Sequence, residues 1–97
     1  MATYISFIQY TQQGLAAIKD SPKRLDAARK AFEQAGAKIK EFYLVMGKYD
    51  IVIIAEAPND EAIARTNLLL GSKGNIKTNT SRAFTETEYR KLIDSLP

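Results

Sequence analysis

The pentapeptide MGKYD at residues 46–50 lies between two apolar runs, Phe42–Val45 and Ile51–Ala55, in the middle of the 97-residue chain. Apolar runs rich in β-branched and aromatic residues are typical of strands. Gly47-Lys48 is typical of a two-residue hairpin loop. Glycine at the first loop position favours a type II′ turn, because glycine adopts a positive φ without a Cβ clash. The sequence therefore predicts that the chain folds back on itself here as a β-hairpin.

Signals before this hairpin predict a strand, a short connection and a helix. Residues 3–10 are rich in β-branched and aromatic types, as expected of a strand, and residues 11–21 form a connection with one helical turn. Ser21-Pro22 suits the cap and first position of a helix, which Gly36 ends. The predicted buried stripe of this helix is Leu25, Ala28, Phe32 and Ala35. The second strand then covers about residues 37–46.

Signals after the hairpin repeat this order. The third strand covers about residues 49–57, and Asn59 or Asp60 caps a second helix. Its predicted buried stripe is Ala62, Ile63, Thr66, Leu69 and Leu70, and its end is Gly71 and Gly74. Residues 75–84 alternate weakly and are mostly polar, as expected of an edge strand. Thr85–Glu88 has the pattern of a capping box and begins a short final helix.

The order of predicted elements defines a fold class. Two strand–helix–strand units of similar length follow one another, joined by the central hairpin. Right-handed crossovers place the four strands in one antiparallel sheet with both main helices on one face. This is the ferredoxin-like βαββαβ arrangement of the α+β class, here with a short C-terminal helix. We expect residues 1–97 to form a single domain of this kind.

The two faces of the central hairpin differ in an informative way. Directly opposed residues share a face, and the two-residue loop places one set under the helices: Phe42, Leu44, Met46, Tyr49, Ile51, Ile53 and Ala55. The other face holds Ile39, Glu41, Tyr43, Val45, Asp50, Val52, Ile54 and Glu56. Aliphatic residues on a face without helices indicate an interface. We therefore expect a homodimer or higher oligomer that packs sheet against sheet, with these contact residues: Ile39, Tyr43, Val45, Asp50, Val52 and Ile54.

The hairpin also carries a family signature. Gly47-Lys48-Tyr49-Asp50 resembles the Gly-x-Tyr-Asp motif of the GYD domain family. The resemblance extends along the chain through Gly14, Ser21–Arg24, Phe42-Tyr43, Glu56–Glu61, Gly71–Asn75 and Arg82–Thr85. It implies a dimeric α/β barrel and leaves the biochemical activity undefined. The hairpin is also similar to the effector-binding domains of leucine-responsive transcription regulators, which bind small amino-acid effectors between subunits. No helix-turn-helix half is evident here, so DNA binding does not transfer.

Composition excludes several chemistries. The chain has no cysteine, no histidine and no tryptophan, which excludes disulfides and thiol chemistry and removes the commonest general base and metal ligand. Glu41 and Glu56 lack a third ligand, so we expect no metal and no cofactor. There is no apolar run long enough to span a membrane and no signal-peptide pattern, so we expect a cytoplasmic protein without a membrane partner.

Four residues are the candidates for binding a small ligand: Tyr43, Tyr49, Asp50 and Arg82. Three of them also have a structural interpretation. Tyr49 would lie in the core, Asp50 would accept backbone N–H groups beside the turn, and Arg82 would pair with a carboxylate across an interface. Gly47 is assigned to the turn. Asp50 and Glu56 are about 20 Å apart along one strand, too far for a pair of catalytic carboxylates.

These observations favour a homo-oligomeric module without catalysis, which binds a small ligand or serves assembly through its sheet face. One alternative is a cofactor-free enzyme of the oxygenase or isomerase type found in the α/β-barrel superfamily, with Tyr, Asp and Arg in place of histidine. The other is a weak nucleic-acid binder, suggested by the net charge of +3. The interspersed charges favour a solvated mixed surface over nucleic-acid binding.

Overall fold

The computed structural model describes residues 1–97 and confirms the ferredoxin-like α+β fold. Its four strands form one antiparallel sheet in the order β2-β3-β1-β4. In chain order the elements are β1 (Ala2–Tyr10), α1 (Gln12–Ala16), the 3₁₀ turn η1 (Ile18–Asp20), α2 (Ser21–Gln34), β2 (Lys38–Leu44), β3 (Ile51–Ala57), α3 (Asp60–Gly71), β4 (Ile76–Ala83) and α4 (Glu86–Asp94). The central strands are therefore β1 and β3, and β4 lies at an edge of the sheet as predicted.

Two helix starts show how local sequence sets these bounds. Asn59 caps α3, because its side chain accepts a hydrogen bond of 2.9 Å from the backbone N–H of Ala62. The predicted cap of α2 is wrong by one residue: Asp20 holds the cap position, and its side chain makes no capping bond. The reason is that η1 runs directly into α2, so the backbone at Asp20 is already helical.

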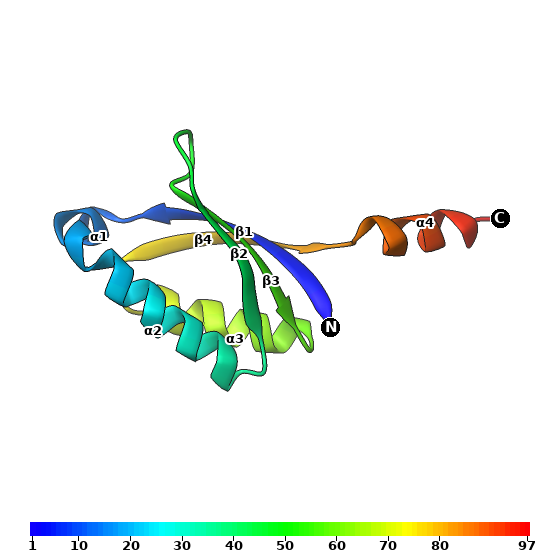
Figure 1. The fold of residues 1–97 in the computed structure, drawn as a ribbon, viewed down its shortest axis with the longest axis horizontal. Helices are drawn as coiled ribbons and strands as arrows, with labels where there is room; N and C mark the ends of the chain where they lie inside the picture. The colour runs from blue at the N-terminus through cyan, green and yellow to red at the C-terminus, as the bar shows by residue number, and fades with distance from the viewer.

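The core lies between the sheet and the helices α2 and α3, which cover the same face (Figure 1). Its buried apolar residues come from all of these elements: Tyr4, Ile8, Phe32, Ala37, Ile39, Ile51, Ile53, Ala55, Ala57, Ala62 and Ile63. Tyr4 also ties β1 to α3, because its hydroxyl donates to the carboxylate of Asp60. Burial is the main cause that raises the pKa of Tyr4 above its ordinary value, and this hydrogen bond raises the pKa further.

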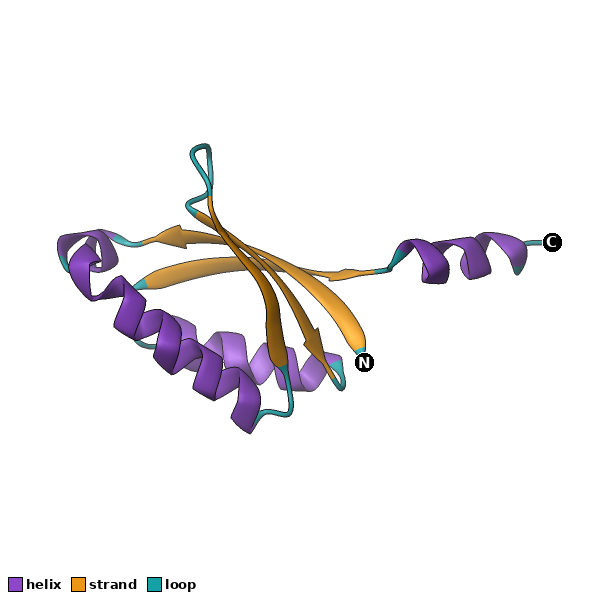
Figure 2. Cartoon of the chain, viewed as in Figure 1, coloured by secondary structure: helices purple, strands orange, loops and turns teal.

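Helix α4 stands apart from this core and extends the molecule to 53 × 30 × 18 Å (Figure 2). The predicted capping box is present: the Thr85 hydroxyl accepts the Glu88 N–H, and the Glu88 carboxylate accepts the Thr85 N–H at 2.9 Å. The apolar stripe of α4 is about half exposed, at 48 to 63% for its members: Tyr89, Leu92, Ile93 and Leu96. This stripe has no cover within the chain.

The capping box makes the start of α4 sensitive to acid. The hydrogen bond from the Thr85 N–H is the main cause that holds the pKa of Glu88 below its ordinary value, and Arg82 lowers it further. A lowered pKa means that the cap contributes fully above the ordinary glutamate pKa and is lost as the pH falls through the folded-state value. We expect carboxyl NMR titration to give Glu88 a midpoint below the ordinary glutamate value, with α4 amide signals shifting at that midpoint.

The variant Glu88→Gln is the control for this prediction. Glutamine can still accept the Thr85 N–H but does not titrate, so the α4 signals should no longer follow the acid transition of residue 88. A Glu88 midpoint at or above the ordinary glutamate value in the wild-type protein would contradict the prediction.

Candidate functional site

The face of the sheet opposite α2 and α3 has no helix over it (Figure 1). We call it the open face, and its apolar members are Ile5, Phe7, Tyr43, Val52 and Ile54. Strand register holds them together, because Val52 lies between Phe7 on β1 and Tyr43 on β2, while Ile54 pairs with Ile5. Phe7 is 37% exposed and Tyr43 is 54% exposed. The prediction that Tyr43, Val52 and Ile54 share a helix-free face agrees with this arrangement.

Ile39 does not belong to the open face, and its predicted place there is wrong. It is buried in the core and pairs with Ala55, whereas Glu41 pairs with Ile54. The register therefore shifts within β2, where Lys40 is the extra residue of a β-bulge. An extra residue reverses the alternation of side chains, so residues before the bulge point to the opposite face from that predicted.

The central hairpin has a wider loop than predicted. The strands end at Leu44 and resume at Ile51, so the loop covers residues 45–50 and is closed by a hydrogen bond of 2.9 Å from Val45 N–H to Asp50 O. Gly47 does not have a positive φ, so the predicted type II′ turn is wrong. Met46, predicted for the core, is fully exposed.

Tyr49 lies on the open face, and its predicted position under the helices is wrong. Its ring packs at a tilt on Phe7, with centroids 5.2 Å apart, and its hydroxyl accepts a hydrogen bond of 3.4 Å from Asn79. Phe7 and Asn79 are paired neighbours on β1 and β4. The loop after β2 therefore folds over this end of the open face and adds an aromatic ring to it.

Asp50 closes the end of the β1–β3 ladder. Its carboxylate accepts a hydrogen bond of 2.9 Å from the N–H of Tyr10, and its own N–H donates to Ile8 O at 2.9 Å. Because β3 begins only at Ile51, the side chain of Asp50 supplies the acceptor for the last residue of β1. This agrees with the structural interpretation of Asp50, in which its carboxylate accepts a backbone N–H group beside the turn. Val45, also predicted for the interface, is half-buried at the start of the same loop.

Arg82 lies on the helix side of β4, away from the other three predicted ligand residues. Its guanidinium carbon is 4.5 Å from the Phe84 ring centroid and 5.8 Å from that of Tyr4. Its Nη2 is 3.8 Å from the Glu88 carboxylate, so the carboxylate paired with Arg82 belongs to the same chain. Tyr43 occupies the other edge strand and the other face. The four predicted ligand residues therefore do not converge on one site.

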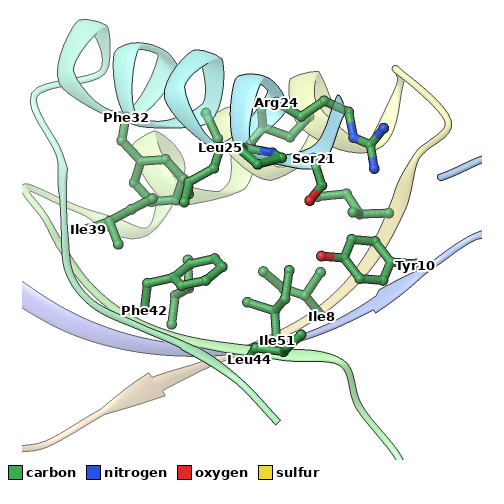
Figure 3. A pocket seen from close by; sticks show the side chains of 15 residues that line it. Ile8, Tyr10, Ser21, Arg24, Leu25, Phe32, Ile39, Phe42, Leu44 and Ile51 are labelled. Atoms are coloured by element: carbon green, nitrogen blue, oxygen red, sulfur yellow. The ribbon is translucent and has the colours of Figure 1, made fainter. Parts of the chain in front are cut away.

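The structure contains a cavity that the sequence pattern did not predict. It lies between α2 and the sheet, has a volume of about 280 Å³, and is lined mostly by apolar side chains (Figure 3). The principal lining residues are Ile8, Tyr10, Ser21, Leu25, Ala28, Phe32, Phe42 and Leu44. The one available signal was Ala28, a short side chain between the bulky Leu25 and Phe32 on α2. No group of three or more acidic residues could hold a metal ion, and no helix is long and apolar enough to cross a bilayer.

Sequence comparison identifies the family of this chain. The model of the GYD domain family matches residues 4–93, so the chain belongs to the GYD domain family, as its signature predicted. A relative from Thermus thermophilus is named glutamine synthetase and cystathionine beta-lyase binding protein. It is 32% identical over 85 residues, which are 87% of this chain and 90% of the relative.

Solved structures share the fold. The feast or famine regulatory protein of M. tuberculosis, solved with L-methionine, superposes with a TM-score of 0.66 at 14% identity over 88% of this chain. The match covers 51% of that protein, so this chain spans about half its length. A further structure, also from Thermus thermophilus, gives a TM-score of 0.56 at 22% identity, with 88% of this chain and 95% of that chain covered. These likenesses concern the fold alone.

Proposed function

We propose that this protein is a non-catalytic binding module that assembles through its open face and binds an enzyme as its partner. The open face carries the proposal: apolar side chains from β1, β2 and β3 lie together on a surface without helices. Contiguous apolar surface of this kind is typical of an interface. A second copy packed sheet against sheet would complete the dimeric α/β barrel that the family resemblance implies.

The name of the Thermus relative supports an enzyme as the further partner, and it supplies glutamine synthetase and cystathionine β-lyase as the two to test. The stripe of α4 is a second apolar surface that has no cover within the chain. A short amphipathic helix fits a groove in a partner through side chains at helical spacing. We therefore assign the enzyme contact to α4 and self-association to the open face.

The test is a binding measurement with a variant of α4. Purified protein should bind the glutamine synthetase or the cystathionine β-lyase of its own source organism in biolayer interferometry. Leu92→Lys should weaken this binding at least about tenfold, because it places a charge in the apolar stripe. Light scattering should show an unchanged dimer mass.

Thr87→Lys is the matched control, since helical spacing places Thr87 on the side of α4 opposite the stripe. It adds the same charge and should leave binding within about twofold. Absence of binding to both enzymes by the wild-type dimer would contradict the proposal. Loss of the dimer in Leu92→Lys would reassign α4 to self-association.

A further inference from the structure

The cavity between α2 and the sheet is large for a protein interior. Cores pack as densely as organic crystals and contain few voids larger than a water molecule. An engineered cavity of about 150 Å³ is enough to bind benzene, and small-molecule pockets begin near 300 Å³. The volume of about 280 Å³ found here is close to that lower limit.

The walls of the cavity are apolar and come from both layers of the fold. Ile8 and Ile51 line the cavity from the central strands, and Leu25 and Phe32 line it from α2 (Figure 3). Ala28 lies between these two helix residues and has a much shorter side chain than either, so it leaves the space unfilled. An apolar molecule in this space would gain the contacts that the lining side chains lack within the chain.

One end of the cavity is polar. The hydroxyls of Ser21 and Tyr10 point towards one another and into the cavity (Figure 3). Both residues use their backbone N–H groups within the chain, Ser21 to Ile18 O and Tyr10 to the Asp50 carboxylate. Neither hydroxyl makes a hydrogen bond within the chain, so both are available to a ligand and can each donate or accept one.

The positive charge at this end belongs to Arg24, whose guanidinium already donates hydrogen bonds outside the cavity. The Arg24 guanidinium donates to Gly14 O at 3.0 Å and to Ala17 O at 2.9 Å, and it lies to the side of the cavity (Figure 3). A buried charged group on a ligand requires a pairing charge, whereas an uncharged one requires only hydrogen bonds. The polar end thus favours a neutral group.

We propose that this cavity binds a compact alkyl or aryl molecule with one uncharged hydroxyl or carbonyl group, which lies against Tyr10 and Ser21. The ligand reaches the cavity at its rim beside Leu44, which lines the cavity and is 70% exposed at the end of β2. This site lies on the helix side of the sheet, opposite the open face. It does not depend on the proposed function.

Four probes test the ligand class by isothermal titration calorimetry and amide NMR: 1-naphthol, naphthalene, 1-naphthoate and 1-octanol. We expect 1-naphthol to bind about fivefold to tenfold more tightly than naphthalene, as one hydrogen bond allows. The charged 1-naphthoate should bind more weakly than 1-naphthol. A comparison of 1-octanol with 1-naphthol decides whether the alkyl or the aryl form is preferred.

Variants locate the site. Ala28→Leu should reduce binding of 1-naphthol at least about tenfold by filling the cavity. The same change at the exposed neighbour, Ala27→Leu, should leave it unchanged. Tyr10→Phe with Ser21→Ala should remove the preference for 1-naphthol over naphthalene while naphthalene still binds. The proposal is overturned if the folded wild-type protein binds none of the probes, or if Ala28→Leu and Ala27→Leu bind 1-naphthol equally well.

Discussion

Val52→Lys is expected to convert the assembled protein into folded monomers. Val52 lies at the centre of the open face, with Phe7 on one side and Tyr43 on the other. In a sheet-against-sheet dimer, the variant loses the burial of a valine and must bury an ammonium group without a partner. Two-fold symmetry repeats this cost in each subunit. The combined loss is about 4 kcal/mol or more, which raises the Kd of the dimer at least about a thousandfold.

Light scattering after size exclusion measures this result directly. At concentrations where the wild-type protein is a dimer, Val52→Lys should elute with the mass of one chain and retain its circular dichroism. Ala64→Lys is the matched control, because it adds the same charge to an exposed position of α3 on the other side of the sheet. A wild-type monomer, or a Val52→Lys protein of unchanged mass, would show that the open face is not the interface.

The second large effect is expected at Gly14. A Cβ atom at this position would lie 2.2 Å from the backbone oxygen of Asn75, far inside van der Waals contact. Asn75 O is also the acceptor for Thr11 N–H at 3.0 Å, so it cannot move without loss of that bond. Overpacking of this kind costs about 1 to 3 kcal/mol. The higher helix propensity of alanine offsets only part of it.

We therefore expect Gly14→Ala to lower the free energy of unfolding by about 2 kcal/mol, which corresponds to a thermal midpoint about 10 °C lower for a domain of this size. Gly47→Ala is the contrasting variant, because nothing lies within 4 Å of a Cβ there and φ is not positive. It should change stability by about 0.5 kcal/mol or less. Equal midpoints for the two variants in thermal and urea unfolding would contradict the close approach at Gly14.

The glycine of the signature motif is therefore not the one at which an added side chain would clash most severely. Gly47 lies in an open loop without steric restriction. Gly14 lies in α1, where Arg24 donates to its carbonyl and Thr11 caps its N–H. The packing of α1 against the Gly74-Asn75 turn joins the end of β1 to the start of β4, two segments that are about sixty residues apart.

Local signals predicted most of the fold. The period of apolar residues and the caps at Asn59 and Thr85 identified the helices, and their ends agree with the structure within a few residues. The common face of four hairpin residues was also predicted, and the register agrees with it: Phe42 pairs with Ile53, and Leu44 pairs with Ile51. These features depend on neighbours in sequence or on one turn, so the sequence contains the needed information.

Features that depend on distant contacts were not predictable in the same way. No glycine or proline marks the bulge at Lys40, yet it moves Ile39 from one face to the other. Tyr49 lies on the open face, where its ring packs on that of Phe7, a residue distant in sequence. The cavity depends on the separation between α2 and the sheet, which no single segment specifies. The sequence therefore predicted the sheet better than it predicted the sites on and below it.

The position of α4 has a consequence for the strength of partner binding. The capping box and the pairing of Arg82 with Glu88 fix the start of this helix relative to β4. In the proposed dimer, two such helices are displayed at a set separation. A partner that is itself a symmetric oligomer can then be held at two points at once, and the second contact forms at a high effective concentration. In that case a weak helix–groove contact would become a long-lived complex by avidity, and a subunit that dissociates from its neighbour would lose that advantage.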